Sequence, residues 1–193
     1  MRVAGFAVLG FMVLAYPVQA TTINFDDGVA TNTIGGFYSA LGVTFSGATW
    51  QSNLGLAGFS GALGLGSTNG NAYKYDSGTP VIATFSAAVN IASIVVIDLG
   101  ENGFTLNAYD APTGGNLVAT ATQFGIGLGN NNFQTLSVSA GTIFRLEMFQ
   151  AQDIGIDGVI VENFQFAPEP GTLAVLGAGL AGLGAMRRRR KAA

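Results

Sequence analysis

Most of this chain is a succession of short β-branched and aromatic runs that are separated by Gly, Asn, Asp and Pro. Runs of this kind, with a turn after each, are typical of strands in an antiparallel sandwich. No stretch between residues 21 and 166 has the apolar spacing of a long helix. We therefore predict an all-β, antiparallel β-sandwich that is jelly-roll-like. The ten candidate strands are 22–25, 42–46, 72–75, 81–85, 92–99, 104–109, 117–122, 133–138, 143–149 and 159–166.

Two of these runs alternate between apolar and polar residues, as half-buried strands do. In 104–109 the apolar set is expected to face the core. In 143–149, Arg145 and Glu147 fall on the opposite side from the apolar residues, which predicts a surface ion pair of small energetic value. The inward side chains of that run are expected to be Phe144, Leu146 and Met148.

Other stretches do not alternate. The run 94–97 is apolar at every position and predicts a central strand that is buried on both faces. The stretch 51–71 is rich in glycine, which weakens helix and strand alike, so we predict a long loop over one end of the sandwich. A second loop of this kind is expected at 124–133.

The charges are distributed unevenly along the chain. Only two of the eight Lys and Arg residues, Lys74 and Arg145, lie between residues 21 and 170, whereas all eleven Asp and Glu residues lie there. Two positive and eleven negative charges give this part a net charge of −9, against −3 for the whole chain. Nucleic acid is therefore excluded as a partner, because phosphate binding requires clustered Lys and Arg.

The chain contains neither cysteine nor histidine. This composition excludes disulfides, thiol catalysis, Cys/His zinc sites and a Ser-His-Asp triad. The fold must then depend on core packing, and the cofactor that this composition leaves open is a hard cation such as calcium, held by oxygen ligands.

Residues 1–20 have the features of a secretory signal peptide, expected as a helix. Arg2 precedes an apolar run, 3–15, and small residues precede a cleavage point between Ala20 and Thr21. The apolar run of about 13 residues is shorter than the roughly 20 that span a bilayer as a helix. We therefore favour cleavage by signal peptidase over an uncleaved anchor.

Three features follow one another at the C-terminal end. Pro168, Glu169 and Pro170 are followed by an uncharged stretch, 171–186, and by a basic tail, 187–193. As a helix the uncharged stretch would be about 24 Å long, somewhat shorter than a hydrocarbon core of about 30 Å. We predict a transmembrane helix there, with the basic cluster on the cytoplasmic side. That cluster is Arg187, Arg188, Arg189 and Arg190.

The order of these parts resembles the PEP-CTERM sorting signal of Gram-negative bacteria. The resemblance implies an exosortase substrate that is processed near 168–170, held transiently at the inner membrane, and then found at the cell surface or in the extracellular matrix. A plain C-terminal anchor is the alternative. The ectodomain would span 21–166 and the sorting signal 167–193. Within the ectodomain, "INFDDG", "GVTFSG", "FTLNAYDAPTGG" and "GIDGVIVENFQF" resemble, more loosely, the jelly-roll ectodomains often attached to this signal.

Three carboxylates flank the first and last candidate strands. Asp26 and Asp27 follow the first strand, and Asp157 precedes the last one. If these strands pair antiparallel, the three side chains converge and offer oxygen ligands to calcium. Gly28 and Gly158 would let backbone carbonyls approach. The alternative is a pair of ordinary turns, in which Asp caps its own backbone.

Trp50 is the only tryptophan, and Tyr38, Tyr73 and Tyr75 lie near the same glycine-rich stretch. A solvent-facing Trp50 ring could stack on a sugar. The alternative is that Trp50 fills one end of the core.

Asp98 and Glu101 lie in one turn and could imitate the carboxylate pair of a glycosidase. A solvated turn is the alternative, because neighbouring turn carboxylates seldom acquire the split pKa values that this chemistry needs. We therefore expect a non-enzymatic exported protein that associates with exopolysaccharide or biofilm. The alternatives are a calcium-dependent carbohydrate-binding module, a small glycan hydrolase, and a structural subunit that polymerises through exposed strand edges.

Overall fold

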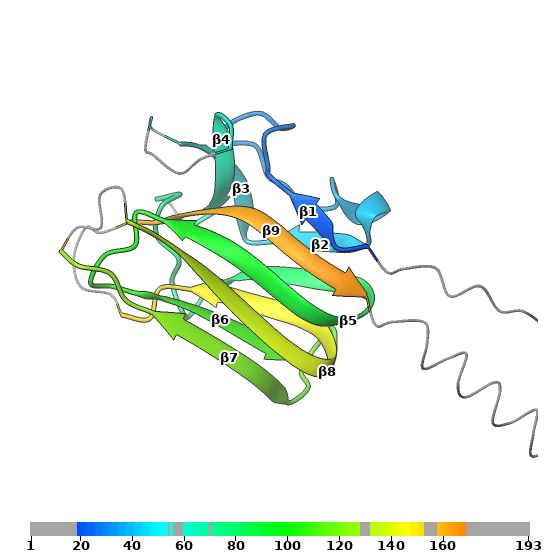
Figure 1. The fold of residues 1–193 in the computed structure, drawn as a ribbon. Helices are drawn as coiled ribbons and strands as arrows, with labels where there is room; N and C mark the ends of the chain where they lie inside the picture. Colours follow the sequence, from blue (N-terminus) through cyan, green and yellow to red (C-terminus); the bar gives the residue numbers. More distant parts are fainter. Residues whose placement is uncertain are drawn as a thin grey trace, which may run out of the picture. The chain divides into compact units, whose positions relative to one another are not determined.

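The computed structural model describes residues 19–53, 55, 60–69, 71–127, 132–152 and 158–168, which form an antiparallel β-sandwich (Figure 1). The predicted all-β class is confirmed. The predicted signal segment, apart from its last two residues, and the predicted transmembrane helix at 171–186 lie outside the described residues. Within the described ranges, no helix is long and apolar enough to cross a membrane.

Nine strands and one short 3-10 helix make up the described part of the chain. In chain order these elements are β1 (Thr21–Ile23), η1 (Ser39–Leu41), β2 (Val43–Ser46), β3 (Ala48–Ser52), β4 (Leu63–Ser67), β5 (Val81–Ile97), β6 (Phe104–Tyr109), β7 (Leu117–Gln123), β8 (Phe133–Phe149) and β9 (Ile160–Pro168).

The long strands β5 and β8 connect the two layers of the sandwich. All nine strands form one hydrogen-bonded sheet that folds over to make both layers. In one layer the first half of β5 lies between β2 and the second half of β8, and β6 and β7 follow. In the other layer the second half of β5 lies between the first half of β8 and β9, and β9 also pairs with β1 and with β4, which pairs with β3. The sequence patterns had divided each long strand in two. That prediction was wrong because register shifts between Thr84 and Ile91 bend the pair while its antiparallel pairing continues on both sides of the bend. The second half of β5 lies between β8 and β9, as predicted for 94–97.

The apolar faces of both layers meet in one core. In β6 the apolar side chains are buried, as predicted. In β8 the predicted direction is right for Leu146 and Met148 but wrong for Phe144, which is half-buried, whereas Ile143 is buried. Ile143 pairs with Val89 at the register shift, so its side chain turns into the core out of phase with the rest of the strand.

The glycine-rich stretch 51–71 was predicted to be a loop, and this was wrong at its start, where β3 continues to Ser52, and again at Leu63–Ser67, which form β4. There β4 pairs with β3 through five residue pairs. A Cβ at Gly66 would lie 2.8 Å from the Gln51 Cβ and 2.9 Å from the Ala72 carbonyl oxygen. Glycine therefore permits a close approach of backbones here.

The stretch 72–75 was predicted to be a strand, and this was also wrong. Its backbone carbonyls accept hydrogen bonds from three separate segments, at 2.8 Å in each case. The donors are the backbone N–H groups of Ser67, Gln150 and Val159. The stretch begins in a turn, in which the Lys74 N–H donates to the Asn71 carbonyl at 3.0 Å, and it does not pair with one neighbouring strand along its length.

Candidate functional site

Pairing of β1 with β9, on which the predicted calcium site depends, is present in the structure. Thr21 pairs with Phe166, and Ile23 pairs with Phe164. Asp26 and Asp27 therefore lie near the beginning of β9, as expected. Asp157 lies outside the described residues, so the predicted set of three stays a prediction. Among the described residues, no group of three or more Asp, Glu, His or Cys side chains could hold a metal ion.

The two described carboxylates of that set bind different partners. Asp26 Oδ1 accepts a hydrogen bond from the Leu63 backbone N–H at 3.1 Å. Asp27 Oδ1 accepts one from the Tyr38 hydroxyl. Asp26 thereby fixes the start of β4, and Asp27 is oriented by a tyrosine that follows it by eleven residues.

Glu162 is a buried carboxylate that was not among the predicted site residues. It is 0% exposed, and it accepts hydrogen bonds from the Ser60 backbone N–H at 2.8 Å and from the Ser60 hydroxyl at 3.0 Å. Burial raises the pKa of Glu162, the charge of Asp26 raises it further, and the bonds from Ser60 oppose this. A lone acidic residue in the apolar run of β9 is the signal that could have identified it.

Trp50 lies inside the core at 4% exposure. A Cβ built on Gly28 would overlap its indole, so the backbone at Gly28 lies directly against the ring. Sugar stacking requires an exposed ring face, which the Trp50 side chain does not have. The structure therefore agrees with the alternative that Trp50 fills one end of the core.

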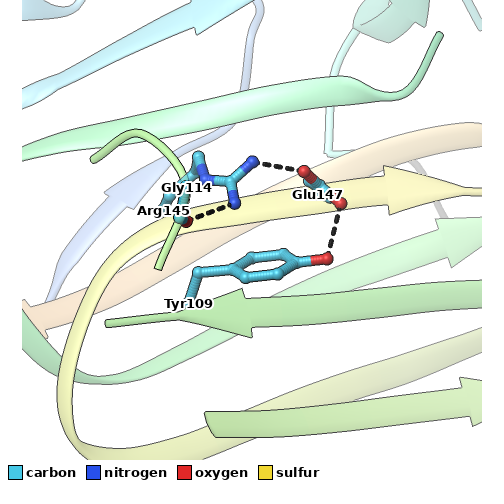
Figure 2. Close-up of polar contacts among 4 residues, drawn as sticks. All are labelled: Tyr109, Gly114, Arg145 and Glu147. Carbon is cyan, nitrogen blue, oxygen red and sulfur yellow. Dashed lines mark hydrogen bonds and ion pairs between the residues drawn. The ribbon is translucent and has the colours of Figure 1, made fainter. Parts of the chain in front are cut away.

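The predicted ion pair between Arg145 and Glu147 is present on the outer face of β8 (Figure 2). The Arg145 guanidinium lies 4.0 Å above the Tyr109 ring and donates to the Gly114 carbonyl at 2.8 Å. The Tyr109 hydroxyl donates to Glu147 at 2.8 Å. These contacts join β6, β8 and the β6–β7 turn, and the cation lies over an aromatic face, so the cluster is more than a surface ion pair.

The turn that carries Asp98 and Glu101 packs at the rim of the sandwich. Asp98 has a φ of 64°, and the Glu101 backbone N–H donates to the Gly127 carbonyl at 3.0 Å. Asn102 is 1% exposed, and its backbone carbonyl accepts from Gln152 at 2.9 Å. The turn is thus held by its neighbours, and its predicted lack of catalysis stays a prediction.

A family model described as the PEP-CTERM protein-sorting motif matches residues 167–190. The chain carries a PEP-CTERM sorting motif. The motif implies an exported protein that an exosortase processes. The matched span includes Pro168, Glu169 and Pro170 together with the arginines at 187–190, and it begins within β9. Of these residues, only Pro168 belongs to the described part of the chain.

The chain that carries this motif is similar in fold to solved structures. The K2 cleaved adhesin domain of Lys-gingipain aligns with 77% of this chain and 99% of its own, with a TM-score of 0.51 and 9% identity. A family 6 carbohydrate-binding module aligns with 77% of this chain and 94% of its own, with a TM-score of 0.38 and 15% identity. The first likeness agrees with the sandwich fold. Curated protein sequences give no significant match.

Proposed function

We propose that this protein is a non-enzymatic component of the cell surface or extracellular matrix, and that its sandwich associates with exopolysaccharide or biofilm. The observation that carries the proposal is the position of the sorting motif, which begins in the last two residues of β9. Processing near 168–170 would leave the described strands whole. The net charge of −9 between residues 21 and 170 suits a hydrated matrix better than an anionic surface.

Four of the described carboxylates support a structural role for acidic residues. Asp26, Asp27 and Glu162 each accept hydrogen bonds from the protein, and Glu147 binds an arginine and a tyrosine. A glycosidase instead needs two carboxyl groups that face one another across a substrate. We therefore propose that this sandwich binds rather than cleaves its ligand.

The intact mass of the protein from its native host tests the sorting part of the proposal. Protein recovered from the cell surface and the medium should end near residue 170, with or without an added lipid or glycan. A mature protein that retains Arg187 to Arg190 would overturn processing by an exosortase.

Affinity electrophoresis tests the matrix part separately. Exopolysaccharide isolated from the same host should retard the exported protein in a native gel, and a gel without polysaccharide should not. A processed protein whose mobility is unchanged at every polysaccharide concentration would leave sorting intact and contradict association with the polysaccharide.

A calcium-dependent carbohydrate-binding module is the second candidate. The favouring observation is that Asp26 and Glu162, from opposite ends of the chain, both bind the segment 60–63. A divalent cation beside them would offset the repulsion between the two charges. Added calcium should then raise the melting temperature, and a chelator should abolish retention by the polysaccharide. A melting temperature that does not respond to calcium would contradict this candidate.

A further inference from the structure

A hollow of about 370 Å³ lies between β3 and the segment that follows β1. Its lining combines an exposed aromatic ring, a buried aromatic ring, a carboxylate, an amide and a hydroxyl. The residues that supply these groups are Phe37, Trp50, Asp27, Asn32 and Thr33. A hollow with an aromatic wall and a few polar groups of different kinds is a common form of ligand site.

Phe37 supplies the exposed ring, and two buried aromatic residues hold it in place. Its side chain is 54% exposed, whereas Trp50 and Tyr38 are 4% and 3% exposed. The Phe37 ring meets each of them edge to face, with centroids 5.0 Å apart in both cases. The ring therefore has a fixed orientation and still presents much of its surface to solvent.

Trp50 also orients the carboxylate of the hollow through a relay of two hydrogen bonds. The indole Nε1–H donates to the Tyr38 hydroxyl at 3.4 Å, and that hydroxyl donates to Asp27. Burial, followed by the bond to Asp27, raises the pKa of Tyr38, so the hydroxyl stays protonated and keeps donating. A carboxylate has about four acceptor positions, so Asp27 retains capacity for donors from a ligand.

The backbone that carries the amide and the hydroxyl is fixed by β3. The Asn32 carbonyl accepts from the Trp50 N–H at 3.1 Å, and the Thr31 N–H donates to the Trp50 carbonyl at 2.7 Å. Thr33 forms a bridge with Thr49. The side chains of Asn32 and Thr33, both exposed, therefore project from a held segment rather than from a free loop.

We infer that this hollow binds one sugar residue of a neutral polysaccharide. The apolar face of the sugar would lie on Phe37, and its hydroxyls would bond to Asp27, Asn32 and Thr33. The inference rests on the proposed association with polysaccharide, and it adds a binding site and a class of sugar. A neutral sugar follows from charge, because Asp27 and the adjacent Asp26 belong to a body with a net charge of −9, which repels a uronate.

Affinity electrophoresis of the exported full chain in mild detergent tests this, with a neutral galactomannan and an acidic alginate as probes. Phe37→Ala should weaken retention by galactomannan about tenfold or more. The matched control is Phe133→Ala, which removes an equally exposed ring, also 54%, outside the hollow; its retention should stay within about twofold of wild type. Asn32→Ala, at an exposed position, should weaken retention about threefold or more.

Melting curves measure whether each variant is folded. If Phe37→Ala does not fold, Asn32→Ala still tests the hollow. If Phe37→Ala and Asn32→Ala both leave retention by galactomannan unchanged, the hollow is not the binding site, although the proposed association with polysaccharide stands. Stronger retention by alginate than by galactomannan would overturn the neutral sugar class. Absence of retention by both probes and by the exopolysaccharide of the host would overturn the proposed association itself, and this inference with it.

Discussion

Single carboxylates hold the loops of this sandwich in place. Glu162 binds the backbone and the hydroxyl of Ser60, and Asp110 binds the backbone and the side-chain amide of Asn116 at 2.7 and 2.9 Å. These bonds from Asn116 lower the pKa of Asp110, whereas burial raises that of Glu162. An ionised acceptor of this kind makes stronger hydrogen bonds than a neutral one. Some of the acidic residues thus hold loops in place, in addition to hydrating the surface.

Replacement of Arg145 tests the cluster on the outer face of β8. Arg145→Ala removes a cation above the Tyr109 ring, a bond to the Gly114 carbonyl and the partner of Glu147. We expect a loss of about 1–3 kcal/mol in the free energy of unfolding. The stability of Arg145→Lys should lie between that of wild type and that of Arg145→Ala, because an ammonium lacks the planar fork that reaches two acceptors. Urea unfolding measures both, and a change below about 0.5 kcal/mol for Arg145→Ala would show that the cluster is unimportant.

The pH dependence of stability tests the environment of Glu162. Its pKa in the folded state is raised, mainly by burial and then by the charge of Asp26. The folded state therefore binds protons more tightly than the unfolded state, and this side chain reduces stability as the pH rises from its ordinary pKa through the folded value. Glu162→Gln removes the titration and keeps an oxygen that can accept from Ser60.

The free energy of unfolding of Glu162→Gln minus that of wild type should consequently become more positive as the pH rises through that window. Urea unfolding at several pH values from about 4 to 7 measures this difference. A difference that is flat or that declines with pH would mean that the carboxyl is not destabilised by its surroundings.

At the scale of elements, the sequence predicts strands well where a single face alternates and poorly where the backbone departs from ideal pairing. The run 104–109 alternates throughout, and β6 has these bounds. The bend of β5 and β8 depends on register shifts that involve pairing between distant residues, so no local pattern marks it. The strand β4 was missed because Gly64 and Gly66 lower its apparent propensity, although Gly66 permits its packing.

Substitution of two strand glycines tests that reading of β4. Gly66→Ala places a Cβ 2.8 Å from the Gln51 Cβ and 2.9 Å from a backbone oxygen, so we expect a loss of about 1–3 kcal/mol from overpacking. The matched control is Gly141→Ala in β8, where a Cβ meets nothing within 4 Å. That control should be neutral or slightly stabilising. Equal melting temperatures for the two variants would contradict a packing requirement at Gly66.

On the scale of the whole molecule, the sequence indicated where the protein goes better than what it binds. A sorting motif is a contiguous pattern, so Pro168, Glu169 and Pro170 could be identified without a fold. The hollow beside Phe37 is assembled from β3 and the segment after β1, and the sequence pattern alone gave no reason to distinguish this phenylalanine from the core set. Trp50, the ring that the sequence suggested for sugar stacking, is buried, and the exposed ring beside it, Phe37, is the one on which the inferred site depends.

The overlap of the sorting motif with β9 makes folding and processing testable together. β9 pairs with β1, β4 and β5, and its last residue, Pro168, pairs with Val89. A protein that ends near residue 170 keeps all of these pairs, so its melting temperature should lie within about 2 °C of that of the full chain in mild detergent. A chain truncated before Ile160 loses the strand that joins these three neighbours and should not fold cooperatively. Calorimetry of the three forms decides this, because a processed form that melts much lower than the full chain would mean that the sorting segment stabilises the sandwich.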